Sequence, residues 1–330
     1  MTAQAPRQIS ASDLIDVSDA VALPSVFKAL GDPLRVQVLR LLRGDSLSVS
    51  ELCEVFQLRQ SALSHHLKVL VQANLVVRRR EGTAVFYRRQ LASGDHSALI
   101  DAVFQAIDAE LLGEDISAGL ARVQSQRERN SVDFFLDNSD RFQEQRELIA
   151  SWQDYSQGTL HLLERCGELS QKRILEIGPG DGSLLPELAK RAHKVTALDN
   201  SEVMLQTAQA HCARSRDIDF RLGTPADLNS EPARFDIAVA NMVLHHTPNP
   251  EQVMQDIAGL LTLGGALVVS ELCAHDQAWA REHCGDLWLG FEPDQLTDWA
   301  RAAQLTPTAE VFITQRNGFQ IQVRLFKRLN

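Results

Sequence analysis

The sequence lacks the features that would place it in a membrane or outside the cell. No apolar run approaches the roughly 18–20 residues that a helix needs to cross a bilayer, and the N-terminus lacks the basic-then-apolar order of a secretory signal. Cysteine is scarce, odd in number and without a CxxC pair; the five are Cys53, Cys166, Cys212, Cys273 and Cys284. This pattern excludes a disulfide framework and predicts reduced thiols in a cytoplasmic protein.

Positive charge is also scarce overall, but it is unevenly distributed. The 330 residues carry a formal net charge of −10, which taken alone argues against nucleic-acid binding. Residues 20–92, however, hold eleven Lys or Arg against five acidic residues, a local charge of +6, so the remainder carries −16. A basic segment on an acidic body is expected when only one part of a protein contacts phosphate. The length suits two domains that each bury a core.

The basic segment has the pattern of two short helices joined by a turn. Residues 48–56 fit a helix with a serine cap, and residues 57–59 turn the chain. A second helix then carries leucines at positions 63, 67 and 70 on one face. In a helix-turn-helix this second helix enters the major groove. Its opposite face presents small or hydrogen-bonding side chains, namely Gln60, Ser61, Ser64, His65 and Lys68.

Two β-rich runs follow the helices, at residues 76–80 and 84–88. The segment Glu81-Gly82-Thr83 separates them, which predicts a hairpin around a glycine-containing turn. Three consecutive arginines, Arg78, Arg79 and Arg80, fall near its tip. A helix-turn-helix followed by a basic hairpin is a winged helix, so double-stranded DNA is the expected partner.

In this order, residues 22–90 resemble the ArsR/SmtB family of winged-helix repressors. The resemblance lies in "ALGDPLRVQVLRLL" and in "SVSELCEVFQLRQSALSHHLKVLVQANLVVRRREGTAVFYR". It implies a homodimer on operator DNA, with recognition-helix contacts by Gln60, Ser61, Ser64 and His65 and wing contacts by Arg78–Arg80. Apolar residues four apart favour a following helix suited to a partner helix: Leu99, Val103, Ile107 and Leu111.

The sequence departs from this family at its best-known metal site. One class of family metal sensors has two cysteines around a valine, whereas here Glu54 and Val55 follow Cys53. Asp95 and His96 match another metal position of the family, but no second His/Glu pair follows at helical spacing. We therefore expect no metal sensing by this domain.

A polar segment links the two halves of the chain. Residues 113–150 are rich in Gln, Arg, Glu, Ser and Asp and contain no proline, which predicts a semi-rigid helical connector. The expected division is a winged-helix DNA-binding and dimerisation domain over 1–112, a helical linker over 113–150 and a second domain over 151–330.

The second domain opens with a strand, a glycine turn and a helix. Residues 173–177 form an apolar run before Gly178-Pro179-Gly180-Asp181-Gly182, and a second strand over 194–198 ends at Asp199. The glycines let a ligand approach the backbone, and an acid after the second strand can accept both hydroxyls of a ribose. Nicotinamide-binding domains also place an acid near this distance, so this unit alone leaves both domain types open.

The later strands favour one of the two types. With strands expected at 235–241 and 263–271, residues 172–272 resemble class I S-adenosylmethionine (SAM)-dependent methyltransferases that act on small molecules. The expected fold is a two-domain chain, an α+β winged helix followed by an α/β Rossmann-like domain with a seven-stranded, mostly parallel sheet. The resemblance implies SAM or S-adenosylhomocysteine (SAH) as ligand. The implied contacts are Glu176 to the ammonium group, Gly178, Gly180 and Gly182 under the methionyl part, Asp199 to the ribose, Asn200 and Met204 beside the adenosine, and Asn241 near the sulfonium. Thr224 stands where the family often has an acid for the adenine.

Catalytic residues are less evident. Either His245 or His246 can act as a general base at neutral pH, or the pair can simply position a loop. The segment after Asn241 lacks the Pro-Pro-aromatic sequence of nucleobase-amine methyltransferases, which argues against DNA base methylation. No metal is expected, because the spacing of Cys273, His275, His283 and Cys284 matches no standard zinc pattern.

Two functions remain open. The full-length order resembles fused regulators of methionine-cycle genes that respond to SAH, which implies a repressor with SAM or SAH as effector. Such a sensor needs a ligand with different affinities for two conformations. Alternatively, the second domain methylates a small acceptor, and the winged helix regulates the protein's own gene.

Overall fold

The computed structural model describes residues 23–81, 84–90, 96–215, 218–228, 234–277 and 279–329, with residues 131–147 given by their backbone alone. The chain divides into two compact units. The first takes the chain up to Arg79 together with Phe86–Ile116, and the second comprises Arg80–Val85 and Ser117–Asn330.

The first unit is the predicted winged helix. Its short sheet has the strand order β1-β3-β2, and the predicted turn residues Gly82 and Thr83 lie outside the described residues. The elements are α1 (Leu23–Leu30), α2 (Pro33–Leu41), β1 (Leu47–Ser48), α3 (Val49–Phe56), α4 (Gln60–Gln72), β2 (Val76–Glu81), β3 (Ala84–Arg89) and α5 (Ser97–Asp108).

Local signals in the sequence set the helix boundaries of this unit. The helix α2 starts at Pro33, and the Asp32 side chain accepts a hydrogen bond from the backbone N–H of Arg35 at 3.1 Å. Ser48 and Glu51 form a reciprocal capping box at the start of α3. The turn between α3 and α4 passes through Gln57 in the left-handed conformation, with a φ of 52°. These caps fix where α4 begins.

One face of α5 remains partly open to solvent in the single chain. Ile100 and Phe104 are buried in the unit, whereas Leu99 is 37% exposed. Val103 and Ile107 are half-buried. Leu111 lies beyond the end of α5 and is 93% exposed. The four residues of the predicted stripe thus present apolar surface that this unit leaves uncovered.

The second unit is built around one large sheet. Before the first strand lie the long helix α6 (Glu114–Ile149, entering this unit at Ser117) and α7 (Trp152–Glu164). The strands are β4 (Arg173–Ile177), β5 (Lys194–Asp199), β6 (Ile218–Leu222), β7 (Phe235–Asn241), β8 (Leu261–Leu272), β9 (Leu305–Thr314) and β10 (Gln320–Arg328). The remaining helices are α8 (Leu185–Arg191), α9 (Glu202–His211), α10 (Pro225–Leu228), α11 (Pro250–Leu260), α12 (Trp279–Cys284) and α13 (Pro293–Ala302), with short 3-10 turns at Leu169–Gln171 and Leu244–His246.

The sheet has the expected seven strands in the order β6-β5-β4-β7-β8-β10-β9. The first five in this order run parallel, while β10 pairs antiparallel with both β8 and β9. Because the order reverses direction between β4 and β7, loops leave the carboxyl ends of these two strands on diverging paths. Ligands of open α/β sheets bind at such a switch point.

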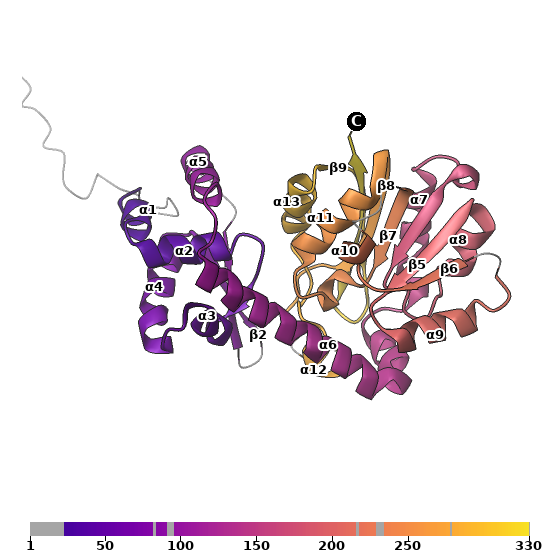
Figure 1. Cartoon of the computed structure of the whole chain (residues 1–330), viewed down its shortest axis with the longest axis horizontal. Helices are drawn as coiled ribbons and strands as arrows, with labels where there is room; N and C mark the ends of the chain where they lie inside the picture. The colour runs from indigo at the N-terminus through magenta and orange to yellow at the C-terminus, as the bar shows by residue number, and fades with distance from the viewer. Residues whose placement is uncertain are drawn as a thin grey trace, which may run out of the picture. The chain divides into compact units, whose positions relative to one another are not determined.

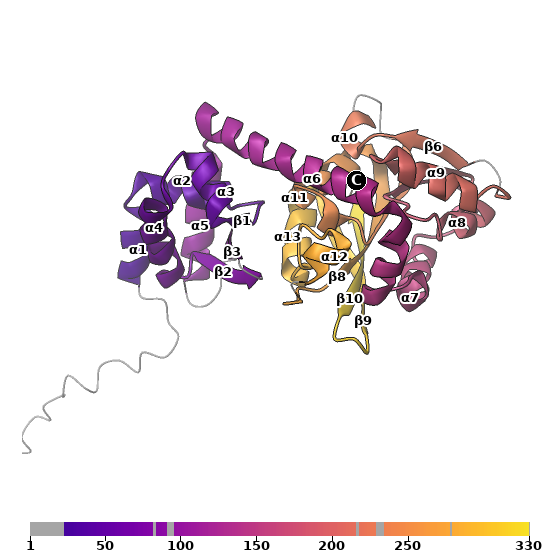
Figure 2. The same ribbon diagram turned by 90° about the horizontal axis from the view of Figure 1, so that it is seen from below.

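Helices cover both faces of this sheet (Figures 1 and 2). The helices α7, α8 and α9 contribute to one buried cluster with the strands, represented by Leu162, Leu188 and Ala208. The helices α11 and α13 contribute to a second cluster, represented by Met254 and Trp299. Two apolar faces on a nearly continuous hydrophobic sheet are typical of doubly wound folds.

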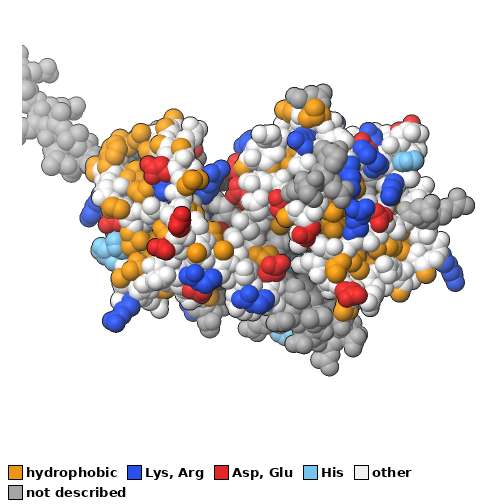
Figure 3. All heavy atoms as spheres, viewed as in Figure 1, with side chains coloured by type: hydrophobic (Ala, Val, Ile, Leu, Met, Phe, Trp, Pro, Cys, Tyr) orange, Lys and Arg blue, Asp and Glu red, His pale blue; other side chains and the backbone are white. Residues whose placement is uncertain are grey.

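Charged side chains are interspersed on the surface of the second unit, where Figure 3 shows basic and acidic groups side by side. At the β5–β6 edge, for example, the Asp219 carboxylate lies 2.9 Å from Arg221 Nε and 3.9 Å from Lys194 Nζ. Among the described residues, no helix is long and apolar enough to cross a membrane.

Candidate functional site

The turn after β4 is a backbone cradle that requires glycine. Gly178, Gly180 and Gly182 have φ angles of 61°, 57° and 80°, a region that other residues enter only with strain. A Cβ on Gly178 would collide with the side chain of Val243. On Gly182 it would lie 3.1 Å from the Cα of Ala208. The chain therefore passes close to its neighbours here, and the backbone itself forms the surface that a ligand meets.

Asp199 is held at the carboxyl end of the adjacent strand β5. Its Oδ1 accepts a hydrogen bond from the backbone N–H of Ser201 at 2.8 Å. Ser201 in turn caps α9 by accepting from the N–H of Met204 at 3.4 Å. Burial raises the pKa of Asp199 to about 6, although backbone hydrogen bonds oppose the shift. This anchored carboxylate is a strong acceptor for a pair of hydroxyl groups.

Asn241 ends the central strand β7 and is oriented by a buried chain of hydroxyl groups. Its Oδ1 accepts from Ser270 Oγ at 2.6 Å, and Ser270 Oγ lies 2.8 Å from Thr159 Oγ1 on α7. The Asn241 Nδ2 is buried and has no hydrogen-bond partner. A buried amide without a partner is costly, so this N–H group is available to a ligand.

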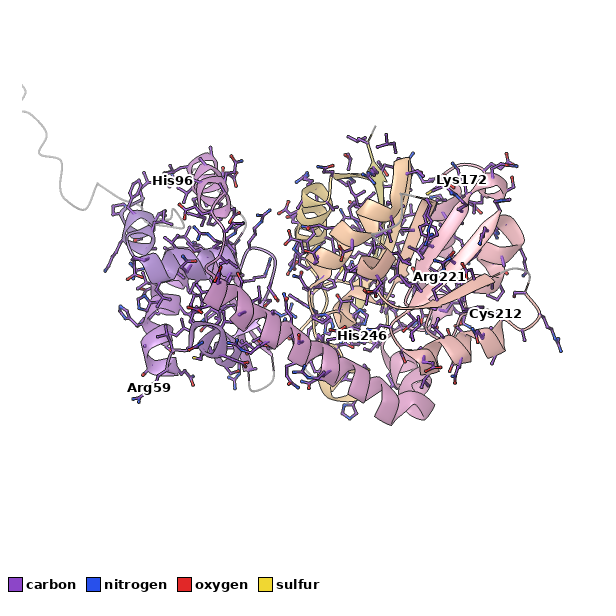
Figure 4. All side chains as sticks on the ribbon, viewed as in Figure 1. Arg59, His96, Lys172, Cys212, Arg221 and His246 are labelled. Carbon is purple, nitrogen blue, oxygen red and sulfur yellow. The ribbon has the colours of Figure 1, made fainter. Side chains whose placement is uncertain are left out.

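These three features border one pocket at the switch point. Its wall comes from the glycine turn, from the start of α9, from the segment after β6 and from the segment after β7. The helix α6 contributes Glu128. The lining residues are Glu128, Ile177, Gly178, Gly180, Leu198, Asp199, Asn200, Ser201, Met204, Gly223, Thr224, Pro225, Asn241, Met242, Val243, His246, Thr247, Pro248 and Val253. Figure 4 labels His246, which lies on the segment after β7.

A second candidate surface lies on the first unit. Leu63, Leu67 and Leu70 anchor α4 in the core with at most 1% exposure. The predicted recognition residues all lie on the exposed side of this helix: Gln60, Ser61, Ser64, His65 and Lys68. On β2, Arg78 and Arg80 are exposed, and Arg79 between them is half-buried. The alternation follows from the two-residue period of a strand.

The two units match two different family models. Residues 32–77 match the model described as "Bacterial regulatory protein, arsR family", and residues 175–269 match the one described as "Methyltransferase domain". The chain joins an ArsR-type DNA-binding domain to a methyltransferase domain. The predicted fusion and both predicted folds are thereby confirmed.

Similar proteins cover the methyltransferase domain. Ubiquinone biosynthesis O-methyltransferases of Xanthomonas campestris pv. campestris (strain B100) and of Coxiella burnetii (strain Dugway 5J108-111) are 29% and 28% identical to it over 148 and 160 residues. These matches cover 40% and 44% of this chain and 62% and 68% of the relatives. In the complex between the Haloferax volcanii Trm112 methyltransferase activator and a methyltransferase, one chain is 17% identical with a TM-score of 0.52. That match covers 60% of this chain and 97% of the other, and it shows the fold alone.

The methyltransferase domain brings most of the predicted ligand residues to the pocket wall. The wall includes Gly178, Gly180, Asp199, Asn200, Met204, Thr224 and Asn241. Glu176 and Gly182 are not among the lining residues. The Glu176 side chain is buried, its Oε2 has no hydrogen-bond partner, and burial together with the Asp181 carboxylate raises its pKa to about 8. A buried carboxyl group without a partner can bind a nearby ammonium group of a ligand. In the same way, the unpartnered N–H of Asn241 can donate a hydrogen bond to an acceptor on the ligand.

Sequence reasoning missed Glu128 and most of the segment after β7. Glu128 comes from the linker, about 50 residues before the glycine turn, and no motif marks it. Arg127 beside it donates to the backbone oxygen of Pro248 at 3.4 Å and lies over the Trp288 ring at 5.8 Å. The helix α6 therefore packs on the same segment that lines the pocket.

Behind this pocket wall lies a buried network centred on His245. Glu271 Oε1 accepts from the N–H groups of Val243 and Leu244 at 3.0 and 2.6 Å, and Glu271 Oε2 lies 2.6 Å from His245 Nδ1. Burial lowers the pKa of His245, but Glu271 and Asp286 outweigh it and raise this pKa to about 9. His245 is only 3% exposed, and it is His246 that lines the pocket.

Proposed function

We propose that this chain is a transcriptional repressor that binds operator DNA and whose methyltransferase domain binds SAM or SAH as its effector. The observation that carries the proposal is the wall of the pocket. It combines the glycine cradle, the anchored carboxylate of Asp199 and a residue of α6, the helix that directly follows the DNA-binding domain. A ligand in this pocket would touch the helix that continues the chain from the winged helix, and we infer that the signal passes along this helix. Genes of methionine and SAM metabolism are the proposed targets.

The proposed ligand contacts follow from the donors and acceptors on the wall. Asp199 accepts the two ribose hydroxyls, Asn200 and Met204 flank the adenosine, and Thr224 lies at the adenine end. Gly178 and Gly180 contact the methionyl part, Gly182 supports it from behind, and the Glu176 carboxylate lies near its ammonium group. Asn241 faces the sulfur. The partly exposed stripe on α5 supports a homodimer, in which two copies of α4 can address two half-sites.

The decisive experiment measures operator affinity as a function of ligand. The operator is first selected from genomic fragments with the purified full-length protein. Its affinity is then compared for protein that is ligand-free, saturated with SAH or saturated with SAM. We expect at least a fivefold difference between two of these states, the lower end of ordinary coupling energies. Identical affinity in all three states would contradict the effector role.

Contacts between the DNA-binding domain and DNA phosphates should make the operator affinity depend on salt concentration. Replacing Lys68 or Arg78 by alanine is expected to weaken operator binding and to reduce the slope of log K against log salt by about 1 each, because each removes one phosphate contact. Fluorescence anisotropy at several salt concentrations measures this slope. Arg301→Ala, an exposed arginine of the second unit, is the matched control and should leave the slope unchanged.

Ligand affinity should also increase with pH, because two buried carboxyl groups, those of Asp199 and Glu176, must be ionised to bind the ligand. The pKa of Asp199 is raised to about 6 and that of Glu176 to about 8. Both groups bind the ligand better when ionised, so SAH affinity should rise as the pH increases from 5 to 8. Calorimetric titrations across this range test it. Glu176→Gln should remove the upper part of the rise and keep the part near pH 6; a flat profile in the unaltered protein would refute the assignment.

A second candidate function is methyl transfer to a small acceptor. It is favoured by His246, which lines the pocket with an imidazole that can accept a proton. The O-methyltransferase names of the similar proteins point the same way. Incubation with labelled methyl donor and small-molecule extract separates the two: transfer to a component that depends on His246 supports the enzyme. DNA base methylation is not proposed.

A further inference from the structure

Three potential metal ligands meet behind the pocket wall. His245 and His246 follow the central strand β7, and Asp286 follows α12. His245 Nε2 lies 3.9 Å from Asp286 Oδ1, and His246 Nδ1 lies 4.0 Å from the same oxygen. One ligand atom from each residue falls within 4.8 Å of the others. The side chains are 4%, 11% and 0% exposed, so the cluster is largely buried and reaches the pocket only through His246.

The carboxylate of Asp286 is the second observation that points to a ligand at this cluster. Both of its carboxylate oxygens are buried, and neither has a hydrogen-bond partner. A buried carboxylate is normally paired or bound to a metal because leaving it alone costs several kcal/mol, roughly, in an apolar interior. Its Oδ1 lies 3.9 Å from His245 Nε2 and 4.0 Å from His246 Nδ1, and the centroids of the two imidazole rings are 4.1 Å apart.

Glu271 determines which atom His245 presents to Asp286. When His245 Nδ1 donates its proton to Glu271, the lone pair of Nε2 faces Asp286 Oδ1. The positive charge between these two atoms comes either from a proton on His245 Nε2 or from a bound cation that takes the place of that proton. A carboxylate behind a histidine is also the usual support of a metal-bound imidazole, because it fixes the tautomer and raises the basicity of the ring.

We propose that His245 Nε2, His246 Nδ1 and an Asp286 oxygen hold a divalent first-row transition ion, with Glu271 as the supporting carboxylate. Two imidazoles and one carboxylate are a common set for zinc and its neighbours in the series. Ligand atoms at 2.0–2.1 Å from a tetrahedral ion are about 3.3 Å apart, so closure shortens the two His–Asp distances by roughly 0.6–0.7 Å and brings the two imidazole nitrogens, within 4.8 Å in this structure, up to about 1.5 Å closer. The Gly285 carbonyl, 3.3 Å from His246 Nδ1, accepts the N–H of that nitrogen in this structure, so ion binding requires His246 to give up this hydrogen bond and present the Nδ1 lone pair.

The position of this site connects it to the pocket without making it depend on the effector. His246 belongs both to the cluster and to the pocket wall. The backbone oxygen of His245 also accepts from the N–H groups of Leu287 and Trp288 at 2.9 and 3.1 Å. An ion here would therefore clamp the segment after β7 to the segment after α12. This proposal departs from the expectation of no metal drawn from the sequence, where His246 and Asp286 are 40 positions apart and no spacing connects them.

The test measures zinc binding by the full-length protein after removal of metals with a chelator. Titration with Zn²⁺, followed by elemental analysis of the desalted protein, should give one ion per chain at this site. Asp286→Asn should lower the affinity by at least 100-fold, and Glu271→Gln by 10- to 100-fold. His283→Ala, an exposed histidine of α12, is the control and should bind as the unaltered protein does. His246→Ala, at the more accessible edge of the cluster, replaces Asp286→Asn if that variant does not fold.

Cobalt identifies the ligand atoms independently. Co²⁺ bound here should show ligand-field bands of a nitrogen and oxygen site, without sulfur-to-cobalt charge transfer. Bands from sulfur would place the ion on Cys273 or Cys284 and overturn the proposal. Binding unaffected by both Asp286→Asn and His246→Ala would overturn it as well. So would a protein that binds no ion, in which case His245 is an imidazolium between two carboxylates. SAH binding is measured separately, with Asp286→Asn rather than His246→Ala, because His246 also lines the ligand pocket.

Discussion

Replacing Asp199 by alanine is expected to weaken SAH binding by about 100-fold or more. Two hydrogen bonds from ribose hydroxyls to a carboxylate are each worth about 1.5–3 kcal/mol, and about 1.4 kcal/mol corresponds to a factor of ten in affinity. The remaining structure should tolerate the change, because Asp199 Oδ1 supports only the local turn at Ser201. Titration calorimetry of the purified variant with SAH measures the loss.

The matched control for this prediction is Asp219→Ala. Asp219 lies on the neighbouring strand β6 and pairs with Arg221 and Lys194 at the surface, outside the pocket wall. It should bind SAH as the unaltered protein does. Operator binding by ligand-free Asp199→Ala should also be normal, since the winged helix is untouched. If the variant keeps full SAH affinity, the adenosyl ligand binds elsewhere and the proposed pocket is wrong.

Gly290→Ala is expected to destabilise the methyltransferase domain by about 3 kcal/mol or more. Gly290 has a φ of 72°, so a side chain there is strained, at roughly 1–2 kcal/mol. The added Cβ would in addition collide with the carbonyl oxygen of Cys273 and lie 2.9 Å from that of Leu272. Backbone atoms of a strand cannot move aside as a flexible side chain would, which adds an overpacking cost of about 1–3 kcal/mol.

Gly167→Ala separates the strain from the collision. Gly167 has a φ of 91°, and its added Cβ would meet nothing within 4 Å. Chemical denaturation of both variants should give a loss of about 1–2 kcal/mol for Gly167→Ala and clearly more for Gly290→Ala. Equal losses would show that the segment beside Cys273 is more compliant than its packing indicates.

The local parts of the site could be predicted from the sequence. A glycine turn and the acid that ends the next strand are neighbours in the chain, and the βαβ geometry brings them together without further information. For the same reason the recognition face of α4 followed from the leucine spacing alone. In both cases a few consecutive residues set the backbone, and the backbone sets the side chains.

The parts formed by distant segments could not be predicted. Glu128 reaches the pocket wall only because α6 packs through Arg127 on Pro248 and Trp288, and neither contact leaves a pattern in the sequence. The His245 and Asp286 side chains meet because two loops leave the sheet at the same edge. His245 was a candidate base, yet its burial beside Glu271 assigns it to the framework and leaves His246 facing the pocket. Such outcomes depend on how loops pack, which residue spacing does not encode.

The hydroxyl groups behind Asn241 determine that this side chain presents hydrogen-bond donors, not an acceptor, to the pocket. Ser270 donates its hydroxyl hydrogen to the amide oxygen of Asn241, so the amide turns its own hydrogens toward the pocket. A thioether sulfur has lone pairs to receive them, whereas a sulfonium has a positive charge that repels them. If the proposed adenosyl ligand places its sulfur beside Asn241, we expect the demethylated molecule to be the better match there, a preference that Ser270 sets from behind the pocket wall.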